Sequence, residues 1–221
     1  MMRIACDRPW LGVDLGAPHR VLSWAVHRPG LVSAQRILWR EVRDADLTPD
    51  LDVAPWLAAE LAARDESGSV AMLTSRDVRR HHHAVARIGG IEVEALATVG
   101  LSNAERVGRR REPDPAGWGT INMAVRIGAA LDLPALVEAM TIAAQARTAA
   151  MIALGPVLST GQATGTGTDC IALAARLDGT PLPHAGLHTA LGEALGRACH
   201  DAVAAGVRAW MQAPPPLPGR R

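Results

Sequence analysis

Short apolar or alternating runs fill the first part of the chain and predict β-strands. Three of these runs are separated by Ala-Pro and Pro-Gly turn signals, which is typical of an antiparallel meander. They cover residues 10–16, 20–27 and 31–42. A helical pattern follows, because Asp52 precedes an apolar run and Pro55 lies near its first turn.

The middle of the chain predicts strands interrupted by one long polar loop. Residues 69–73 predict a strand, and residues 81–100 predict a hairpin that turns at a Gly-Gly pair. Residues 119–128 predict a further strand. The stretch 103–118 is too polar and too broken by Pro and Gly to form an element, and loops of this length are often functional or mobile.

The last third of the chain is mainly helical in its pattern. Residues 133–154 and 187–211 each carry polar side chains at helical spacing opposite an apolar face. Strands that come early and long helices that come late predict an α+β protein with a mixed, largely antiparallel sheet and helices on one or both faces. We expect one domain over residues 1–211 and a disordered Pro-rich tail over residues 212–221.

Composition removes several kinds of chemistry. The chain has no Lys, Tyr or Phe, so a Schiff-base lysine, a Walker A lysine and a phenolic acid or base are excluded. The candidate reactive residues are therefore His, Asp, Glu, Cys, Ser, Thr, Asn and Arg. The formal net charge of +1 gives no global basic field, so nucleic acid is not an expected partner.

Cysteine usage and the N-terminal pattern favour a cytoplasmic protein. Cys6, Cys170 and Cys199 are far apart and form no C-x-x-C pair, which suits a reducing compartment. The N-terminal stretch does not resemble a signal peptide, and no run of about 18 uncharged apolar residues predicts a membrane span. A homo-oligomer remains open.

The strongest local signal is the stretch "TGTGTD" at residues 164–169, which we call the Gly/Thr turn. It is not a Rossmann fingerprint, because Cys170 stands where the third Gly belongs and a strand follows. It is not a P-loop, because no Lys follows. Two interpretations remain open: a small-residue turn whose backbone meets a ligand, with Asp169 at the strand entrance, or a plain Gly turn into a core strand.

The predicted start of the last helix is the second candidate. His188 and Thr189 would lie beside free backbone N–H groups, where an anion or a base can be held. Glu193 would not share the face of His188, so a His-Glu metal pair is doubtful. The structural alternatives are a capping or packing role for His188 and a favourable first-turn acid for Glu193.

The two Asn residues of the chain, Asn103 and Asn122, are candidate amide or oxyanion donors. Turn formation is the alternative, and it suits Asn103 better than Asn122. The "HHH" at residues 81–83 invites a metal interpretation, but strand alternation sends its second His to the opposite face. Cys170 could be a nucleophile beside the Gly/Thr turn, although a Cys entering an apolar strand is usually a core residue.

The chain resembles the adenosylcobinamide amidohydrolases of corrinoid salvage. Four segments carry the resemblance, in this order and at about the family's spacing, and they cover roughly the C-terminal half. They are "SNAERVG", "GTINMAV", "ATGTGTDCIALAA" and "HAGLHTALGEALG". Each is weak alone, but four in order are specific. The chain departs from the family pattern at His184, Leu187, Gln145 and Arg147.

The resemblance implies hydrolysis of the amide that joins the aminopropanol arm to the corrin ring of adenosylcobinamide, with complete cobamides as further substrates in some relatives. The product would be adenosylcobyric acid, and the corrinoid is substrate rather than cofactor. In this hypothesis His188, Asp169, Glu193 and Thr168 form the catalytic set. The expected substrate contacts are Gly165, Thr166, Gly167, Asn122 and Asn103.

Several alternatives stay open. The nucleophile could be water, or Thr166, Thr168 or Cys170 acting covalently. A requirement for a divalent metal is not decided by the residues. The competing function is a non-catalytic corrinoid or nucleotide-binding module that uses the same Gly/Thr turn.

Overall fold

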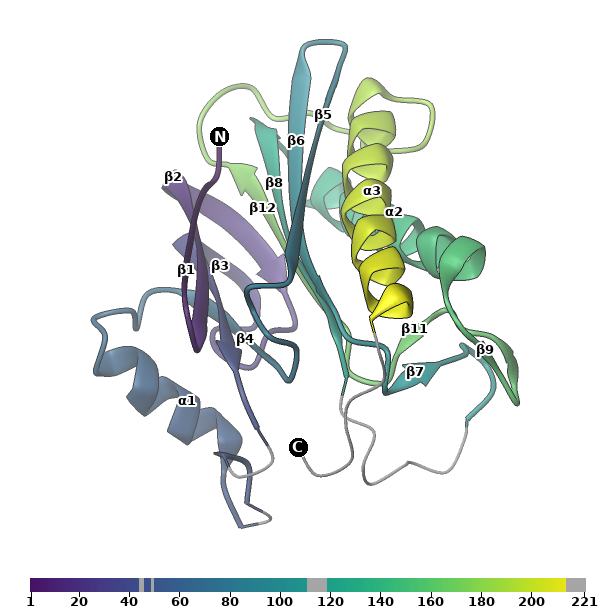
Figure 1. Ribbon diagram of the computed structural model, residues 1–221. Coiled ribbons are helices and arrows are strands. Elements are labelled where there is room, and N and C mark those ends of the chain that lie inside the picture. The colour runs from purple at the N-terminus through teal and green to yellow at the C-terminus, as the bar shows by residue number, and fades with distance from the viewer. Residues whose placement is uncertain (44–45, 49, 111–118, 214–221) are drawn as a thin grey trace.

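The computed structural model describes residues 1–43, 46–48, 50–110 and 119–213, and within them it shows an eight-stranded sheet and three helices (Figure 1). The sheet order is β4-β3-β2-β12-β8-β6-β5, and β1 also pairs with β2. Five of its strand pairs are antiparallel and two, β3·β4 and β8·β12, are parallel. The strands are β1 (Arg3–Asp7), β2 (Trp10–Ser23), β3 (Gly30–Glu41), β4 (Val70–Thr74), β5 (His81–Ile88), β6 (Ile91–Val99), β8 (Ile121–Ala130) and β12 (Cys170–Arg176). The predicted α+β class with a mixed, largely antiparallel sheet is confirmed.

The remaining elements are short strand pairs and the helices. β7 (Ala104–Glu105) pairs with β11 (Gly165–Thr166), and β9 (Val157–Leu158) pairs with β10 (Gly161–Gln162). The helices are α1 (Val53–Ala62), α2 (Leu133–Leu154) and α3 (Ala190–Gln212). No helix of the described residues is long and apolar enough to cross a membrane.

Three apolar cores divide the molecule into layers. One core lies between α2, α3 and one face of β6, β8 and β12, to which Val93, Met123 and Leu173 contribute. A second core fills the space between the opposite face of these strands and the β2–β4 part of the sheet. A third lies between α1 and the outer face of β3 and β4. Figure 1 shows the resulting order: α1, the β1–β4 part, the β12–β5 part, then α2 and α3.

The long strand β2 joins two strands that the sequence predicts separately. Its pairing with β3 shifts register between Asp14 and His19, so one strand bends instead of ending. Gly16 lies in this bend with a φ of 85°, where a side chain would be strained, and its N–H donates to Asp14 Oδ1 at 2.7 Å. The Ala-Pro signal therefore marks a bulge rather than a turn, and the predicted boundary there is wrong.

The two long helices begin at capping residues. Asp132 accepts a hydrogen bond from the N–H of Ala135 at 2.8 Å, and Thr189 accepts one from Gly192 at 2.9 Å. The predicted helix over 133–154 is confirmed in full. The predicted helix over 187–211 starts three residues later, because Thr189 is its N-cap.

The three consecutive histidines alternate across β5 as predicted. His83 Nε2 lies 3.2 Å from Glu94 Oε2, while the ring of His82 approaches Gly206 of α3 on the other face. His81 Nδ1 lies 2.8 Å from the carbonyl oxygen of Val78. The alternation therefore separates His82 from His81 and His83.

Buried histidine makes the stability depend on pH. His19 is 3% exposed, and burial lowers its pKa, with Arg126 and Arg176 acting in the same direction. The unfolded chain therefore binds a proton at His19 at a higher pH than the native chain does. Stability is lost as the pH falls below about 6.5.

We expect the free energy of unfolding to fall below pH 6.5 with a contribution from His19 of up to about 1.4 kcal/mol per pH unit. Urea denaturation between pH 5 and 8 measures it. His19→Gln should flatten this dependence, and only in part, because burial also lowers the pKa of His82. Identical slopes for the wild type and His19→Gln would contradict the assignment.

Residues 214–221 of the predicted tail and residues 111–118 of the predicted loop lie outside the described residues. Within the described part of that loop, Ala104 and Glu105 form the short strand β7, so the prediction of no element there is wrong. Helix α3 reaches Gln212, one residue beyond the predicted domain end.

Candidate active site

Two strand starts meet at one end of the sheet. β8 and β12 run parallel, with Asn122 opposite Cys170, so the segments that lead into them lie side by side. Gly119 and Thr120 lead into β8, and the Gly/Thr turn leads into β12. The predicted place of Asp169 at the entrance of a buried strand is confirmed.

The glycines of the Gly/Thr turn permit close contact with the protein's own groups. A Cβ at Gly165 would lie 2.5 Å from Asp169 Oδ2, and one at Gly167 would lie 2.9 Å from Asn103 Nδ2. The N–H of Gly167 also donates to the carbonyl oxygen of Asn103 at 3.1 Å. Larger residues would therefore push the turn away from Asp169 and Asn103.

Asp169 is the most heavily bonded side chain of this region. Its side chain is 7% exposed, and Oδ2 lies 2.7 Å from Arg147 Nη1 of α2. The N–H of Thr166 donates to Oδ2 at 3.1 Å, and the N–H of Ile121 donates to Oδ1 at 3.1 Å. Burial raises the pKa of Asp169, while Arg147 and the hydrogen bonds from Thr166 and Ile121 oppose that rise.

Thr166 adds a hydroxyl to this carboxylate. Thr166 Oγ1 donates to Asp169 Oδ1, while Arg147 holds the other carboxylate oxygen. A hydroxyl bonded to a base that a third group orients is the general arrangement of an activated nucleophile. The same carboxylate can serve a water molecule that binds in this place.

A second polar group lies on the β8 side. Thr120 Oγ1 lies 3.0 Å from Asn122 Oδ1 and 2.8 Å from the carbonyl oxygen of Thr168, and its one proton serves one of them. Asn122 Nδ2 donates to the carbonyl oxygen of Leu73 at 2.6 Å, and Thr168 Oγ1 donates to that of Gly119 at 3.2 Å. Asn122 and Thr168 are thus held in fixed orientations.

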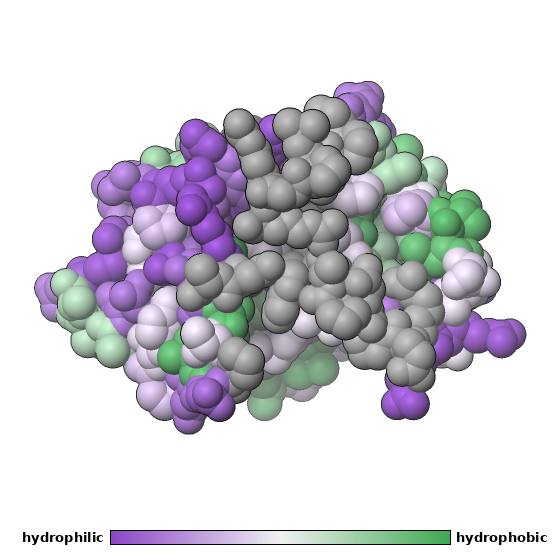
Figure 2. Space-filling view, turned by 60° about the horizontal axis from the view of Figure 1, so that its bottom comes forward, coloured by the Kyte–Doolittle hydropathy of each residue, from purple (hydrophilic) through white to green (hydrophobic). Residues whose placement is uncertain are grey.

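An apolar hollow of about 260 Å³ opens at this end of the sheet. It lies between the two sheet parts, since β4 and the segments that follow β2 and β3 contribute to one wall, and the starts of β8 and β12 contribute to the other. Its lining is Trp24, Val26, Val42, Leu47, Met72, Leu73, Thr74, Ser75, Gly119, Thr120, Asn122, Thr168, Asp169 and Cys170. Figure 2 looks onto this end and shows apolar surface set among hydrophilic surface.

A second, more polar hollow of about 330 Å³ adjoins the apolar one. Arg147, Thr166 and Gly167 line it, and both hollows share Trp24 and Asp169. Trp24 is 50% exposed, and its indole Nε1 donates to the carbonyl oxygen of Asp169 at 2.7 Å. The exposed ring of Trp24 therefore stands between an apolar and a polar compartment.

The structure does not bring His188 and Glu193 to Asp169. They lie at the start of α3, where the Cβ of Ala190 comes within 2.8 Å of the Cβ position of Gly89 in the β5–β6 turn. β6 runs from that turn to the Asp169 end over nine residues, which corresponds to about 26 Å. His188 is exposed, and Glu193 Oε1 pairs with Arg197 Nη2 at 3.1 Å.

Cys170 lacks the properties of a thiolate nucleophile. Burial raises its pKa to about 12, so the neutral thiol dominates at neutral pH. Its side chain belongs to the core between the two sheet parts. Within the described ranges, no three His, Cys, Asp or Glu side chains gather as a metal site would require.

Sequence reasoning missed Arg147, Trp24 and Thr120. Arg147 carries a signal, because it is a cation on a helix that is otherwise rich in small apolar residues. Trp24 and Thr120 carry none, since their roles depend on which strands become neighbours.

Comparison with known proteins identifies the family of this chain. The model of the adenosylcobinamide amidohydrolase family matches residues 1–215. A curated relative, the adenosylcobinamide amidohydrolase of Halobacterium salinarum, is 31% identical over 154 residues. That alignment covers 67% of this chain and 62% of the relative, so the chain spans less than two thirds of that relative's length.

Two solved structures are more distantly similar. A protein from Pyrococcus horikoshii OT3 has a TM-score of 0.46 at 11% identity, covering 89% of this chain and 76% of its own. The L-aminopeptidase D-Ala-esterase/amidase of Ochrobactrum anthropi has a TM-score of 0.42 at 10% identity, covering 93% of this chain and 82% of its own.

The family match places this chain in a class of amide hydrolases. The chain belongs to the adenosylcobinamide amidohydrolase family.

Proposed function

We propose that this protein hydrolyses the amide that joins the aminopropanol arm to the corrin ring of adenosylcobinamide, yielding adenosylcobyric acid for corrinoid salvage in the cytoplasm. The family match over residues 1–215 carries this proposal. The paired hollows at the start of β8 and β12 support it, because they combine apolar surface with a carboxylate, an amide and hydroxyls.

The proposed chemistry centres on Asp169. Amide hydrolysis requires an activated nucleophile, donors for the developing oxyanion and an acid for the leaving amine. Asp169 accepts the proton of the attacking group, which is the Thr166 hydroxyl or a water in its place. Arg147 fixes the carboxylate, and the protonated carboxyl then returns the proton to the leaving amine. Where Thr166 attacks, a water then hydrolyses the Thr166 ester, which releases the acid and restores the hydroxyl.

The remaining polar groups bind the substrate in this proposal. Asn122 donates one amide hydrogen to the carbonyl oxygen of Leu73, and its second amide hydrogen can bind a substrate carbonyl. A corrin ring with its amide side arms is far larger than a cavity of about 260 Å³. One edge or arm of the corrinoid therefore enters the apolar hollow, while the rest of the ring stays outside.

Incubation of the purified protein with adenosylcobinamide tests the function, with and without a chelator. Mass spectrometry of the products should show free aminopropanol and adenosylcobyric acid. Tight binding of adenosylcobinamide without release of aminopropanol over hours would instead favour a non-catalytic corrinoid-binding module. Loss of turnover only with the chelator would assign a metal to the reaction.

The position of His188 gives a further prediction. Because α3 begins at the opposite end of β6 from Asp169, we expect His188→Ala to keep turnover within about threefold of the wild type, well below the hundredfold expected for a general base. Steady-state kinetics on folded protein measures this. A loss of a hundredfold or more would return His188 to the catalytic set.

A further inference from the structure

Arg76 lies beside the apolar hollow on the loop between β4 and β5. It follows Ser75, which lines that hollow. The Cβ position of Gly100 lies 3.8 Å from Arg76 Cβ and 3.5 Å from the backbone nitrogen of Thr120, another lining residue. Arg76 does not line the hollow itself, but its Cβ lies next to residues that do.

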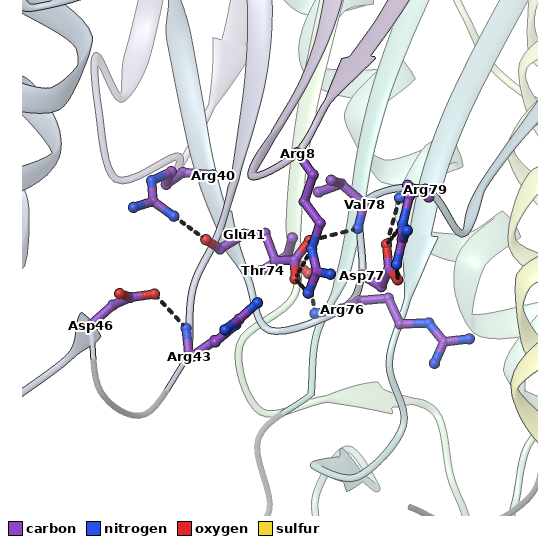
Figure 3. Close-up of polar contacts among 10 residues, drawn as sticks. All are labelled: Arg8, Arg40, Glu41, Arg43, Asp46, Thr74, Arg76, Asp77, Val78 and Arg79. Atoms are coloured by element: carbon purple, nitrogen blue, oxygen red, sulfur yellow. Dashed lines mark hydrogen bonds and ion pairs between the residues drawn. The ribbon is translucent and has the colours of Figure 1, made fainter. Parts of the chain in front are cut away.

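The guanidinium of Arg76 has no partner among the described residues, whereas those of Arg8 and Arg79 nearby are paired (Figure 3). Arg8 is paired with Glu41, and Arg79 Nη2 lies 2.6 Å from Asp77 Oδ2. The one hydrogen bond of Arg76 drawn in Figure 3 comes from its backbone N–H to Thr74 Oγ1, at 3.1 Å. Glu41 and Asp77 are thus already engaged by other cations.

Arg76 differs from the other partly buried arginines. Its Nε is buried without a hydrogen-bond partner. Arg36, Arg126 and Arg147 also have a buried Nε, but each forms an ion pair through its terminal nitrogens. Burial lowers the pKa of Arg76, Arg80 lowers it further, and Asp77 opposes the effect. A partly buried cation without a counter-ion is costly, and an anionic ligand relieves that cost.

We propose that Arg76 binds a phosphate group on the aminopropanol arm of the substrate, and so favours phosphorylated over unphosphorylated corrinoids. This proposal rests on the proposed function for the identity of the ligand. The planar guanidinium fits a phosphate through two parallel hydrogen bonds. Arg79 and Arg80 on the same loop add positive charge, against the single acid Asp77.

The first experiment measures binding of the leaving group alone. Calorimetry at low salt compares aminopropanol phosphate, aminopropanol and inorganic phosphate with the wild type, Arg76→Gln and Arg80→Gln. We expect Arg76→Gln to weaken the binding of aminopropanol phosphate at least tenfold, because charge-assisted hydrogen bonds are lost. Arg80→Gln removes the same charge from an exposed position of the loop, and should weaken the binding of aminopropanol phosphate by twofold or less.

The second experiment measures turnover of adenosylcobinamide and its phosphate. Arg76→Gln should lower the ratio of kcat/KM for the phosphate substrate to kcat/KM for adenosylcobinamide at least tenfold. Urea denaturation should show no loss of stability in Arg76→Gln, because no native partner of its guanidinium is removed. A strong loss of stability would reveal a structural role and overturn the proposal.

The two proposals fail in different ways. Binding of aminopropanol phosphate through Arg76 without amide hydrolysis would overturn the proposed function and keep Arg76 as an anion-binding residue. Equal effects of Arg76→Gln and Arg80→Gln on phosphate binding would show a general electrostatic attraction by the loop and overturn the Arg76 proposal. Equal affinity of the wild type for aminopropanol and its phosphate would also overturn it.

Discussion

Replacing Asp169 by Asn is expected to lower turnover by at least a hundredfold and to destabilise the fold by about 3 kcal/mol. The amide keeps the shape of the carboxyl group, but it cannot accept the proton of Thr166 or a water. It also leaves the Arg147 guanidinium, 17% exposed, without its counter-ion. Kinetics with adenosylcobinamide and urea denaturation measure the two effects.

A double variant separates the two effects of Asp169→Asn. Adding Arg147→Met removes the unpaired buried charge, so much of the lost stability should return while turnover stays low. If turnover returns together with stability, Asp169 has only a structural role in the Gly/Thr turn.

Thr166→Val then distinguishes the two possible nucleophiles. It keeps the side-chain shape without the hydroxyl. A loss of turnover comparable to that of Asp169→Asn favours attack by Thr166, and retained turnover favours water.

Replacing Gly119 by Ala is expected to destabilise the protein by about 1–3 kcal/mol and to lower turnover more than tenfold. The added Cβ would lie 2.8 Å from the carbonyl oxygen of Gly100 and 2.8 Å from the nitrogen of Ser102. These are backbone atoms, so residues 100–103 must shift. The carbonyl oxygen of Asn103 holds the N–H of Gly167, and the shift therefore reaches the Gly/Thr turn.

Gly196→Ala is the matched control for Gly119→Ala. Its Cβ would lie 3.9 Å from Ile142 Cγ2, which is an ordinary contact, and the position is inside α3. Alanine should raise the stability there by up to about 1 kcal/mol and leave turnover unchanged. Thermal unfolding and kinetics of both variants test the contrast, and equal behaviour of the two would contradict it.

Most of the elements could be predicted because their periodicity is local. The helix over 133–154 has both an Asp N-cap and a continuous apolar face, and its bounds are confirmed. β1 (Arg3–Asp7) was missed because four of its five residues are exposed and no alternation marks it. The bend in β2 was misread because its Gly-Ala-Pro signal is compatible with both a turn and a bulge.

The candidate site was only partly predictable. The position of Asp169 follows from the strand that begins beside it. Its partner Arg147 lies 22 residues earlier on α2, and no local pattern pairs them. The hypothesis that joins His188 to Asp169 follows from the family resemblance, which does not say which segments become neighbours. The structure puts them at opposite ends of β6.

The position of β12 within the sheet has a consequence for how the chain folds. β12 is the last strand of the sheet along the chain, but it lies between β2 and β8 and links the two sheet parts. A ribosome makes β1–β8 first, and these strands cannot form one sheet until β12 emerges. The contact of Thr120 with Thr168 spans 48 residues, so the site assembles late, in a step that closes a long loop and slows folding.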